Sequence, residues 1–198
     1  MATRKLKYSI LGLINRSPMS GYDLRKYFVE SLSHFWNAEF NQIYTELRRL
    51  QEEGLVEFDT VKAGEKLEKK VYRITEAGHK DFMDWLFLDE PLPPQRADSF
   101  RLRVYFSENL SVEELEKLFN AQCIRHWAVL LELEDSLYSI MRAEEMDLTQ
   151  YSEHLLIEGG ILREEAYIRW LHQCAERMDF TLDDSRYAKM RHARTESA

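Results

Sequence analysis

The hydrophobic and polar positions between residues 40 and 75 predict a helix followed at once by a two-stranded hairpin. Ile43, Leu47 and Leu50 recur at spacings of four and three residues, so they share one apolar helix face. Gly54 follows where a glycine commonly ends a helix. Residues 55–61 and 69–75 are rich in β-branched and aromatic residues, which is typical of strands. This order of elements indicates a winged helix-turn-helix.

Two further helices are predicted before this segment. Apolar residues at helical spacing indicate a helix over residues 7–15, and a serine–proline pair ends it. Ser20 and Asp23 stand three residues apart, which is the spacing of a capping box at the start of a second helix. Residues 31–39 are expected to form the loop into the third helix. Three helices and a hairpin complete the winged-helix order.

The pattern after the hairpin predicts helices to about residue 180. Thr75 is the expected N-cap of a helix that carries Phe82 and Trp85 on its apolar stripe. The proline cluster within residues 89–94 marks a domain boundary. We therefore divide the chain into a winged helix-turn-helix domain at residues 1–88, a proline-rich linker at 89–98, a helical dimerisation domain at 99–180 and a polar tail at 181–198.

Two long helices are predicted in the second half. The first starts with a capping box at Ser111 and carries apolar residues at spacings of three and four for about eight turns. The second is expected to begin near Thr149. Two such helices cannot bury both flanks alone, so we expect coiled-coil-like pairing with a second copy; folding back onto the first domain is the alternative. Gly159 and Gly160 interrupt the second helix, which suggests a close helix crossing or a local kink.

The composition agrees with this mainly α fold, a winged helix-turn-helix followed by a coiled-coil-like dimerisation domain. Hydrophobic residues make up 44% of the chain, whereas there are only 7 Gly and 4 Pro. No apolar run approaches the roughly 20 residues that span a bilayer. The basic and apolar start is interrupted by Asn15 and Arg16 without a cleavage site, so we expect a cytoplasmic protein and no signal peptide.

The net charge of −8 is unusual for a DNA-binding protein, but it is unevenly distributed. Residues 1–88 hold 14 Lys and Arg against 13 Asp and Glu, a net charge of +1, whereas residues 89–198 hold 13 against 22, a net charge of −9. Between residues 40 and 75, seven basic residues are offset by seven acidic ones. The specificity of DNA binding must therefore depend on where individual basic side chains point.

The predicted third helix has a polar face suited to DNA. Its members are Asn41, Gln42, Tyr44, Thr45, Arg48 and Arg49. Arg48 and Arg49 are expected to contact phosphates or guanine, and Asn41, Gln42 and Thr45 to contact base edges or sugars. Tyr44 is expected to pack against the DNA backbone or to hydrogen-bond to it.

The predicted hairpin supplies further cations. For these lysines, and for the two arginines of the helix, there is also an explanation that does not involve DNA. Lys66, Lys69 and Lys70 are expected to reach flanking phosphates or the minor groove. The alternative is that these lysines only keep an exposed hairpin in solution. The two arginines of the helix have an alternative as well, which is pairing with Glu46, Glu52 or Glu53 on a solvated helix face.

Several stretches, taken in their order and spacing, resemble the PadR family of bacterial transcriptional regulators. They are residues 8–14 (YSILGLI), 19–24 (MSGYDL), 42–44 (QIY), 47–50 (LRRL), 53–55 (EGL), 71–78 (VYRITEAG), 85–86 (WL) and 100–107 (FRLRVYFS). The chain departs from the family pattern at Thr45, where proline is common, at Ser20, where histidine is frequent, and at residues 63–66 of the wing. The resemblance implies a homodimer that binds a pseudo-palindromic operator, usually as a repressor. Many members release DNA when a small aromatic or cationic compound binds near the dimer interface.

Other sites and functions were weighed on the same residues. Trp127, Tyr138 and Trp170 lie on the long helices and are candidates to line an effector pocket, although aromatic stripes are more often plain core. Two pairs have metal-ligand spacing, Cys123 with His126 and His154 with Glu158, but nothing brings them together, so no metal or other cofactor is expected.

Two other classes of function were considered. Phosphate-loop, zinc-protease and nucleophile-elbow motifs are missing from the sequence, so an enzyme is not expected. The remaining alternative is a winged-helix protein that binds other proteins through its acidic half and does not bind an operator.

Overall fold

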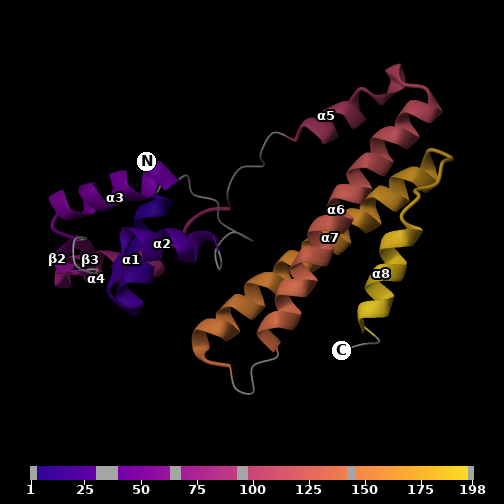
Figure 1. Ribbon diagram of the computed structural model, residues 1–198. Helices are drawn as coiled ribbons and strands as arrows, with labels where there is room; N and C mark the ends of the chain where they lie inside the picture. The colour runs from indigo at the N-terminus through magenta and orange to yellow at the C-terminus, as the bar shows by residue number, and fades with distance from the viewer. Residues whose placement is uncertain (1–3, 30–39, 63–67, 93–97, 142–145, 196–198) are drawn as a thin grey trace. The chain divides into compact units, whose positions relative to one another are not determined.

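The computed structural model describes residues 4–29, 40–62, 68–92, 98–141 and 146–195 of the chain (Figure 1). The chain divides into two compact units, Met1–Pro93 and Pro94–Ala198. Each unit has a hydrophobic core of its own. We therefore describe each unit by itself.

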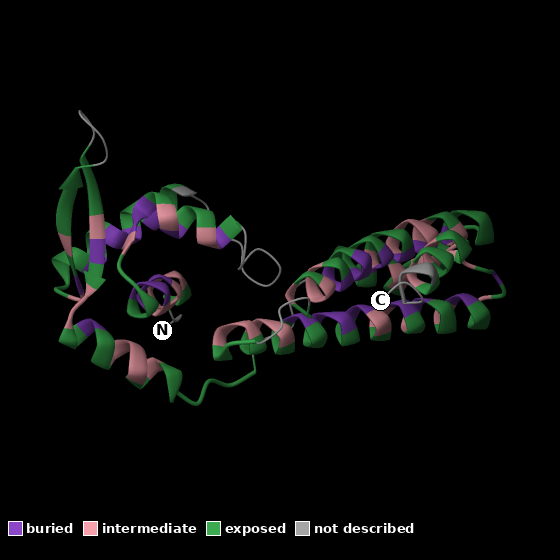
Figure 2. Ribbon diagram, turned by 60° about the horizontal axis from the view of Figure 1, so that its bottom comes forward, coloured by how far each residue is buried: buried purple, intermediate pink, exposed green. Residues whose placement is uncertain are grey.

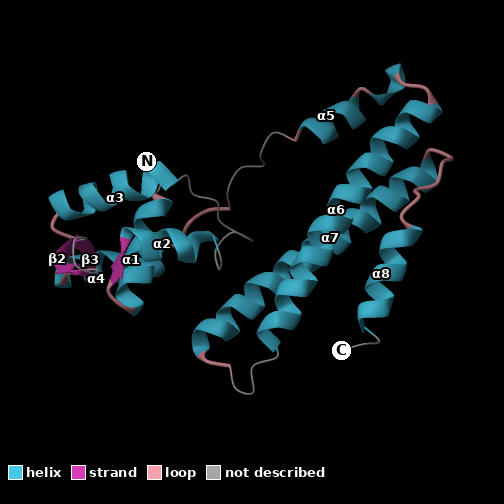
Figure 3. Ribbon diagram, in the orientation of Figure 1, coloured by secondary structure: helices cyan, strands magenta, loops and turns pink. Residues whose placement is uncertain are grey.

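The N-terminal unit is a winged helix-turn-helix, as predicted (Figure 3). Its elements are α1 (Lys5–Arg16), β1 (Met19–Ser20), α2 (Gly21–Tyr27), α3 (Phe40–Glu52), β2 (Val56–Lys62), β3 (Glu68–Ile74) and α4 (Glu76–Leu86). The strands form an antiparallel sheet in the order β1-β3-β2. The sequence did not predict β1, because a strand of two residues carries no periodic pattern. The expected loop at residues 31–39 lies outside the described residues.

The core of this unit is made by the apolar faces that the sequence predicted. Ile43, Leu47 and Leu50 of α3 are fully buried, together with Leu11 of α1 and Leu24 of α2. Each side chain of this size contributes roughly 1.5–3 kcal/mol when it leaves water. This packing fixes which face of α3 remains at the surface.

Two glycines set the junction between α3, the sheet and α4. Gly54 has φ +70°, a left-handed conformation that ends α3 and turns the chain into β2. A Cβ atom on Gly78 would lie 2.0 Å from the carbonyl oxygen of Leu55, so only glycine fits there. Thr75 caps α4 by accepting from the N–H of Gly78, and its hydroxyl donates to the carbonyl oxygen of Gly54. The base of the hairpin is thereby fixed to the end of α3.

The C-terminal unit contains the two long helices, α6 (Val112–Met141) and α7 (Leu148–Arg177), which run antiparallel and side by side (Figure 1). α5 (Ser99–Tyr105) and the short η2 (Ser107–Asn109) precede them, and α8 (Ser185–Thr195) follows. Figure 2 shows the buried positions as stripes along the long helices. Gly160 lies against Leu133 of α6, which supports the close crossing, whereas Gly159 faces open space. In the described parts of the chain, no helix combines the length and apolar character that crossing a membrane requires.

Two details of this unit differ from the sequence analysis. The last long helix begins at Leu148, one residue before the expected start at Thr149, because Asp147 and Gln150 form its capping box. Residues 181–198 were described only as a polar tail, but residues 185–195 form α8. Leu182 and Tyr187 pack against the core, and the sequence missed this because most α8 side chains are polar.

Candidate nucleic-acid interface

The outer surface of α3 presents all six residues that the sequence proposed for DNA contact. Asn41, Gln42, Thr45, Arg48 and Arg49 are exposed. The ring of Tyr44 is about half exposed. The Thr45 hydroxyl donates to the carbonyl oxygen of Asn41, 2.9 Å away, one turn earlier in the helix. Its oxygen can still accept a hydrogen bond from a ligand.

Arg4 neutralises one acidic side chain of α3, Glu46, and one directly after the helix, Glu53. Its guanidinium forms ion pairs with Glu46 and with Glu53, the latter at 2.6 Å. The Glu46 side chain is almost fully buried. The hydrogen bond to Glu53 raises the pKa of Arg4, as does the one to Glu46, although partial burial works in the opposite direction.

This arrangement involves two of the three carboxylates of the alternative explanation, in which Arg48 and Arg49 pair with Glu46, Glu52 or Glu53. Glu46 and Glu53 were candidate partners of Arg48 and Arg49, but they are bound to Arg4. The sequence predicts only a basic start to the chain and gives Arg4 no role of its own. It could not connect residues that lie 42 and 49 positions apart.

Tyr44 is held by close packing against the start of α2. A Cβ atom on Gly21 would lie 2.5 Å from the Tyr44 ring, so the ring occupies the space above a glycine. Burial raises the pKa of Tyr72 on β3; Tyr44 adds to this shift and Arg48 opposes it. Tyr44, Arg48 and Tyr72 are therefore electrostatic neighbours, which places part of α3 beside the sheet.

The wing carries cations that already have contacts within the chain. Lys69 Nζ lies 3.7 Å from Asp23 Oδ2, and Lys70 Nζ lies 4.0 Å from the centre of the Phe58 ring. Both lysines remain exposed. Lys66 lies outside the described residues. Lys69 thus contacts α2 and Lys70 contacts the hairpin, and neither side chain is buried.

Asp23 links the helix-turn-helix to the wing. Ser20 and Asp23 form the predicted capping box of α2, with Asp23 Oδ2 accepting from both the backbone N–H and the hydroxyl of Ser20. The hydrogen bond from the Ser20 hydroxyl lowers the pKa of Asp23. Ser20 also pairs with Val71 of β3, so one residue joins the helix cap to the sheet. The sequence predicted the cap but not this link.

The three proposed effector residues lie in different surroundings within the C-terminal unit. Trp127 is buried and stacks on Tyr187 of α8. Trp170 packs edge-on against Phe100 of α5, whereas Tyr138 is partly buried on α6. None of the three lines the hollow of about 450 Å³ in this unit, which is lined by Leu102, Arg103, Phe106, Leu110, Glu114 and Leu118.

The first pair with metal-ligand spacing, Cys123 and His126, has other partners. In the second pair, His154 stacks on Tyr151. His126 contacts Glu164 of α7 at 2.5 Å and stacks on Tyr167. Burial alone would raise the pKa of Glu164. The hydrogen bond from His126 and the nearby Arg163 together outweigh burial, so the pKa of Glu164 is lowered. Cys123 lies instead beside His172 and Asp184, two residues that the sequence analysis did not consider. That analysis could not combine them because they share no sequence motif.

The helices, the wing and the exposed polar face of α3 place this chain in the class of winged helix-turn-helix proteins. Residues 10–84 match the model of the transcriptional regulator PadR-like family, and residues 98–179 match the virulence activator alpha C-terminal model. The negative transcriptional regulator PadR of Bacillus subtilis is 38% identical over 89% of this chain and 98% of its own.

The solved structures give the same result. The crystal structure of Bacillus subtilis PadR in complex with operator DNA has a TM-score of 0.81 at 38% identity, covering 88% of this chain and 98% of that one. The structure of the same protein in complex with p-coumaric acid has a TM-score of 0.80 at 35% identity, covering 89% and 99%. The chain belongs to the PadR-like family of transcriptional regulators, as the resemblance implied, and this family is not one of enzymes.

Proposed function

We propose that this protein is a repressor that binds a pseudo-palindromic operator as a homodimer. The observation that supports this most strongly is the exposed polar face of α3, on a chain similar to a PadR that was crystallised with operator DNA. A major groove admits one α-helix, and exposed Arg, Asn and Gln side chains match the groups on base edges and phosphates. An operator lies in the cytoplasm of a bacterium, so the protein acts there.

In this proposal each group of residues has its own task. Arg48 and Arg49 contact phosphates or guanine, while Asn41, Gln42 and Thr45 contact base edges or sugars. Tyr44 packs against the DNA backbone. The wing lysines reach flanking phosphates; they are Lys66, Lys69 and Lys70. Asp23 must give up its contact with Lys69 when a phosphate binds there.

The long helices form the dimer in this proposal. Apolar side chains at the surface of α7 include Leu155, Leu156 and Leu162, each about half exposed or more. A second copy would remove this surface from water, and a two-fold axis between copies matches a two-fold operator. Residues 1–88 then act as the DNA-binding domain, residues 89–98 as the linker and residues 99–180 as the dimerisation domain, with α8 packed on the last.

In this proposal, binding of a small aromatic compound causes the protein to release the operator. Bacillus subtilis PadR has been crystallised with p-coumaric acid, and this chain covers nearly all of that one. Trp127, Tyr138 and Trp170 remain our candidates for contact with such a compound.

The test is a binding titration of the full chain on the promoter region of its own operon. We expect sequence-selective binding that weakens steeply as salt rises, because phosphate contacts release counterions. Arg48→Ala should weaken binding roughly tenfold or more. Lys80→Ala, which removes an exposed cation of α4, should have little effect. Adding p-coumaric acid to the wild-type complex should lower the bound fraction, whereas acetate should not.

Two results would contradict the proposal. If no genomic fragment is bound selectively, the protein does not act on an operator, and partners that bind its acidic half would favour the alternative function. If Arg48→Ala and Lys80→Ala weaken binding equally, α3 does not carry the contacts.

A further inference from the structure

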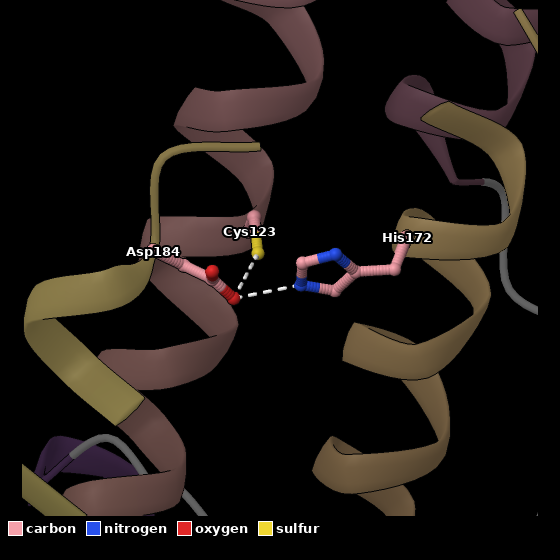
Figure 4. Close-up of side chains that lie close together, drawn as sticks. All are labelled: Cys123, His172 and Asp184. Carbon is pink, nitrogen blue, oxygen red and sulfur yellow. Dashed lines mark hydrogen bonds and ion pairs between the residues drawn. The ribbon is translucent and has the colours of Figure 1, made fainter. Parts of the chain in front are cut away.

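A cysteine, a histidine and an aspartate from three different elements meet in the C-terminal unit (Figure 4). Cys123 lies on α6, His172 on α7, and Asp184 directly before α8. Asp184 Oδ2 is 2.7 Å from His172 Nε2 and 3.8 Å from Cys123 Sγ. One ligand atom from each residue lies within 4.8 Å of the others. Among the residues that the structure describes, this is the one group of such side chains with metal-binding spacing.

We propose that Cys123, His172 and Asp184 bind a single thiophilic divalent cation of the zinc type. A thiolate, an imidazole nitrogen and a carboxylate oxygen are the donors that Zn²⁺ takes in tetrahedral sites. Calcium and magnesium favour six or more oxygen ligands, so this donor set excludes them. Three protein ligands leave the fourth position for water or another small ligand.

The observed distances are close to those of a tetrahedral site. Bonds of about 2.0–2.3 Å place the ligand atoms of such a site about 3.3–3.8 Å from one another. The sulfur and the carboxylate oxygen already have this separation. The imidazole has to move away from the carboxylate by less than about 1 Å and toward the sulfur. His172 can make this adjustment because 45% of its side chain is exposed.

The surroundings hold Asp184 in position before any metal binds. Trp127 Nε1 donates to Asp184 Oδ2 at 2.7 Å, a contact of the type that orients metal-binding carboxylates. The carbonyl oxygen of Asp184 accepts from the N–H groups of Tyr187 and Ala188 in the first turn of α8. The N–H of Asp183 donates to the side chain of Asn120 on α6. The carboxylate therefore needs no rearrangement of the backbone.

The electrostatics of this group favour a cation. Cys123 is fully buried, and its Sγ lies 3.8 Å from Asp184 Oδ2. The negative charge of Asp184 disfavours a thiolate at Cys123. A divalent cation between the sulfur and the carboxylate compensates this charge. Binding displaces the thiol proton to solvent, and the sulfur becomes the metal ligand.

A bound metal would connect all three helices at the start of α8. This end of α8 is already held by the hydrogen bond from Trp127 to Asp184, by the one from the Asp183 N–H to Asn120, and by stacking of Tyr187 on Trp127. Coordination bonds to α6 and α7 would fix α8 more firmly over Trp127. This consequence does not depend on whether the protein binds an operator.

The test uses Co²⁺ as a spectroscopic probe on the full chain after treatment with EDTA. We expect one equivalent to bind, with visible bands of tetrahedral cobalt and an intense near-ultraviolet thiolate-to-cobalt band, and Zn²⁺ to displace it. Cys123→Ser should abolish the thiolate band. Cys174→Ser is the matched control, because it removes the other cysteine of the chain. His172→Gln should weaken Co²⁺ binding at least tenfold, and its half-exposed position lets it fold even if Cys123→Ser does not.

Three outcomes would overturn the proposal. One is cobalt binding without a thiolate band, which would indicate surface histidines or carboxylates only. Another is a band that persists in Cys123→Ser and disappears in Cys174→Ser. The last is equal cobalt affinity of the wild type and of His172→Gln, with circular dichroism showing that both are folded.

Discussion

At the scale of single residues, Arg4 pairs with carboxylates beside the proposed DNA-binding face. It forms ion pairs with Glu46 of α3 and with Glu53 directly after it, two carboxylates that would otherwise offset the charge of Arg48 and Arg49. Its partner Glu46 is nearly buried, so the carboxylate has little water to replace the guanidinium. One residue at the N-terminus therefore both holds α3 against α1 and leaves its outward cations available for DNA.

Replacing Arg4 should reduce both stability and DNA binding. In Arg4→Ala, the carboxylate of Glu46 is left without its partner, which should cost roughly 1–3 kcal/mol in urea unfolding. Operator affinity should fall as well, because Glu46 and Glu53 regain their influence on the arginines. The double variant Arg4→Ala, Glu46→Gln should recover most of the stability, since its amide is uncharged. Failure of the second change to recover stability would show that the ion pair is not the cause.

Asp23 should make stability depend on pH in the acidic range. Its pKa is lowered in the folded state, mainly by the hydrogen bond from the Ser20 hydroxyl. The stabilisation is therefore fully present above the unfolded carboxyl pKa of about 3.9 and is lost as pH falls through the lower folded value. We expect Asp23→Asn to lose stability at pH 7 and to show a smaller further loss on acidification than the wild type. Ser20→Ala should do the same; an unchanged acid limb in both variants would contradict this assignment.

At the scale of elements, α6 and α7 pack closely at Gly160, where Leu133 of α6 fills the space beside the glycine. Gly159 and Gly160 are consecutive in α7, yet they face different surroundings. A Cβ atom at Gly160 would lie 3.1 Å from a methyl group of Leu133, whereas nothing lies within 4 Å of one at Gly159. Substitutions at Gly159 therefore report the intrinsic cost of glycine in a helix, whereas substitutions at Gly160 also report the packing of the two helices.

Alanine at these two positions should have different effects on stability. Gly159→Ala should stabilise the protein by up to about 1 kcal/mol, because alanine is the better helix former. Gly160→Ala should gain less or lose stability, because Leu133 must move to accept the new methyl group. Thermal unfolding of the two variants side by side measures the difference. Equal stabilisation by both would mean that the crossing is looser than described.

How far the sequence predicted these elements depends on their periodicity and length. The face of α3 and both long helices were predicted because apolar residues repeat over several turns. β1 has two residues and α8 is mostly polar, so neither produces a clear pattern. The contacts of Arg4 with α3 and the group at Asp184 join residues far apart in the chain. Only the folded structure brings such residues together, so this part of the site could not be predicted.

At the scale of the whole molecule, the charge distribution agrees with a division of tasks. Residues 89–198 carry a net charge of −9 and residues 1–88 a net charge of +1. An acidic half repels phosphates, which confines DNA contact to the winged unit. Two copies joined through the long helices would present two α3 helices to one duplex. This arrangement is the central claim, since it combines the reading helix, the dimer and the operator symmetry.

The most direct test is hydroxyl-radical footprinting of the full chain on the promoter fragment. The account predicts two protected half-sites of inverted sequence, with centres one helical turn of about 10 base pairs apart or a multiple of it. Arg48→Ala should weaken both halves together, because each copy supplies the same residue. A single asymmetric protected region, or protection that is unchanged in Arg48→Ala, would contradict the account.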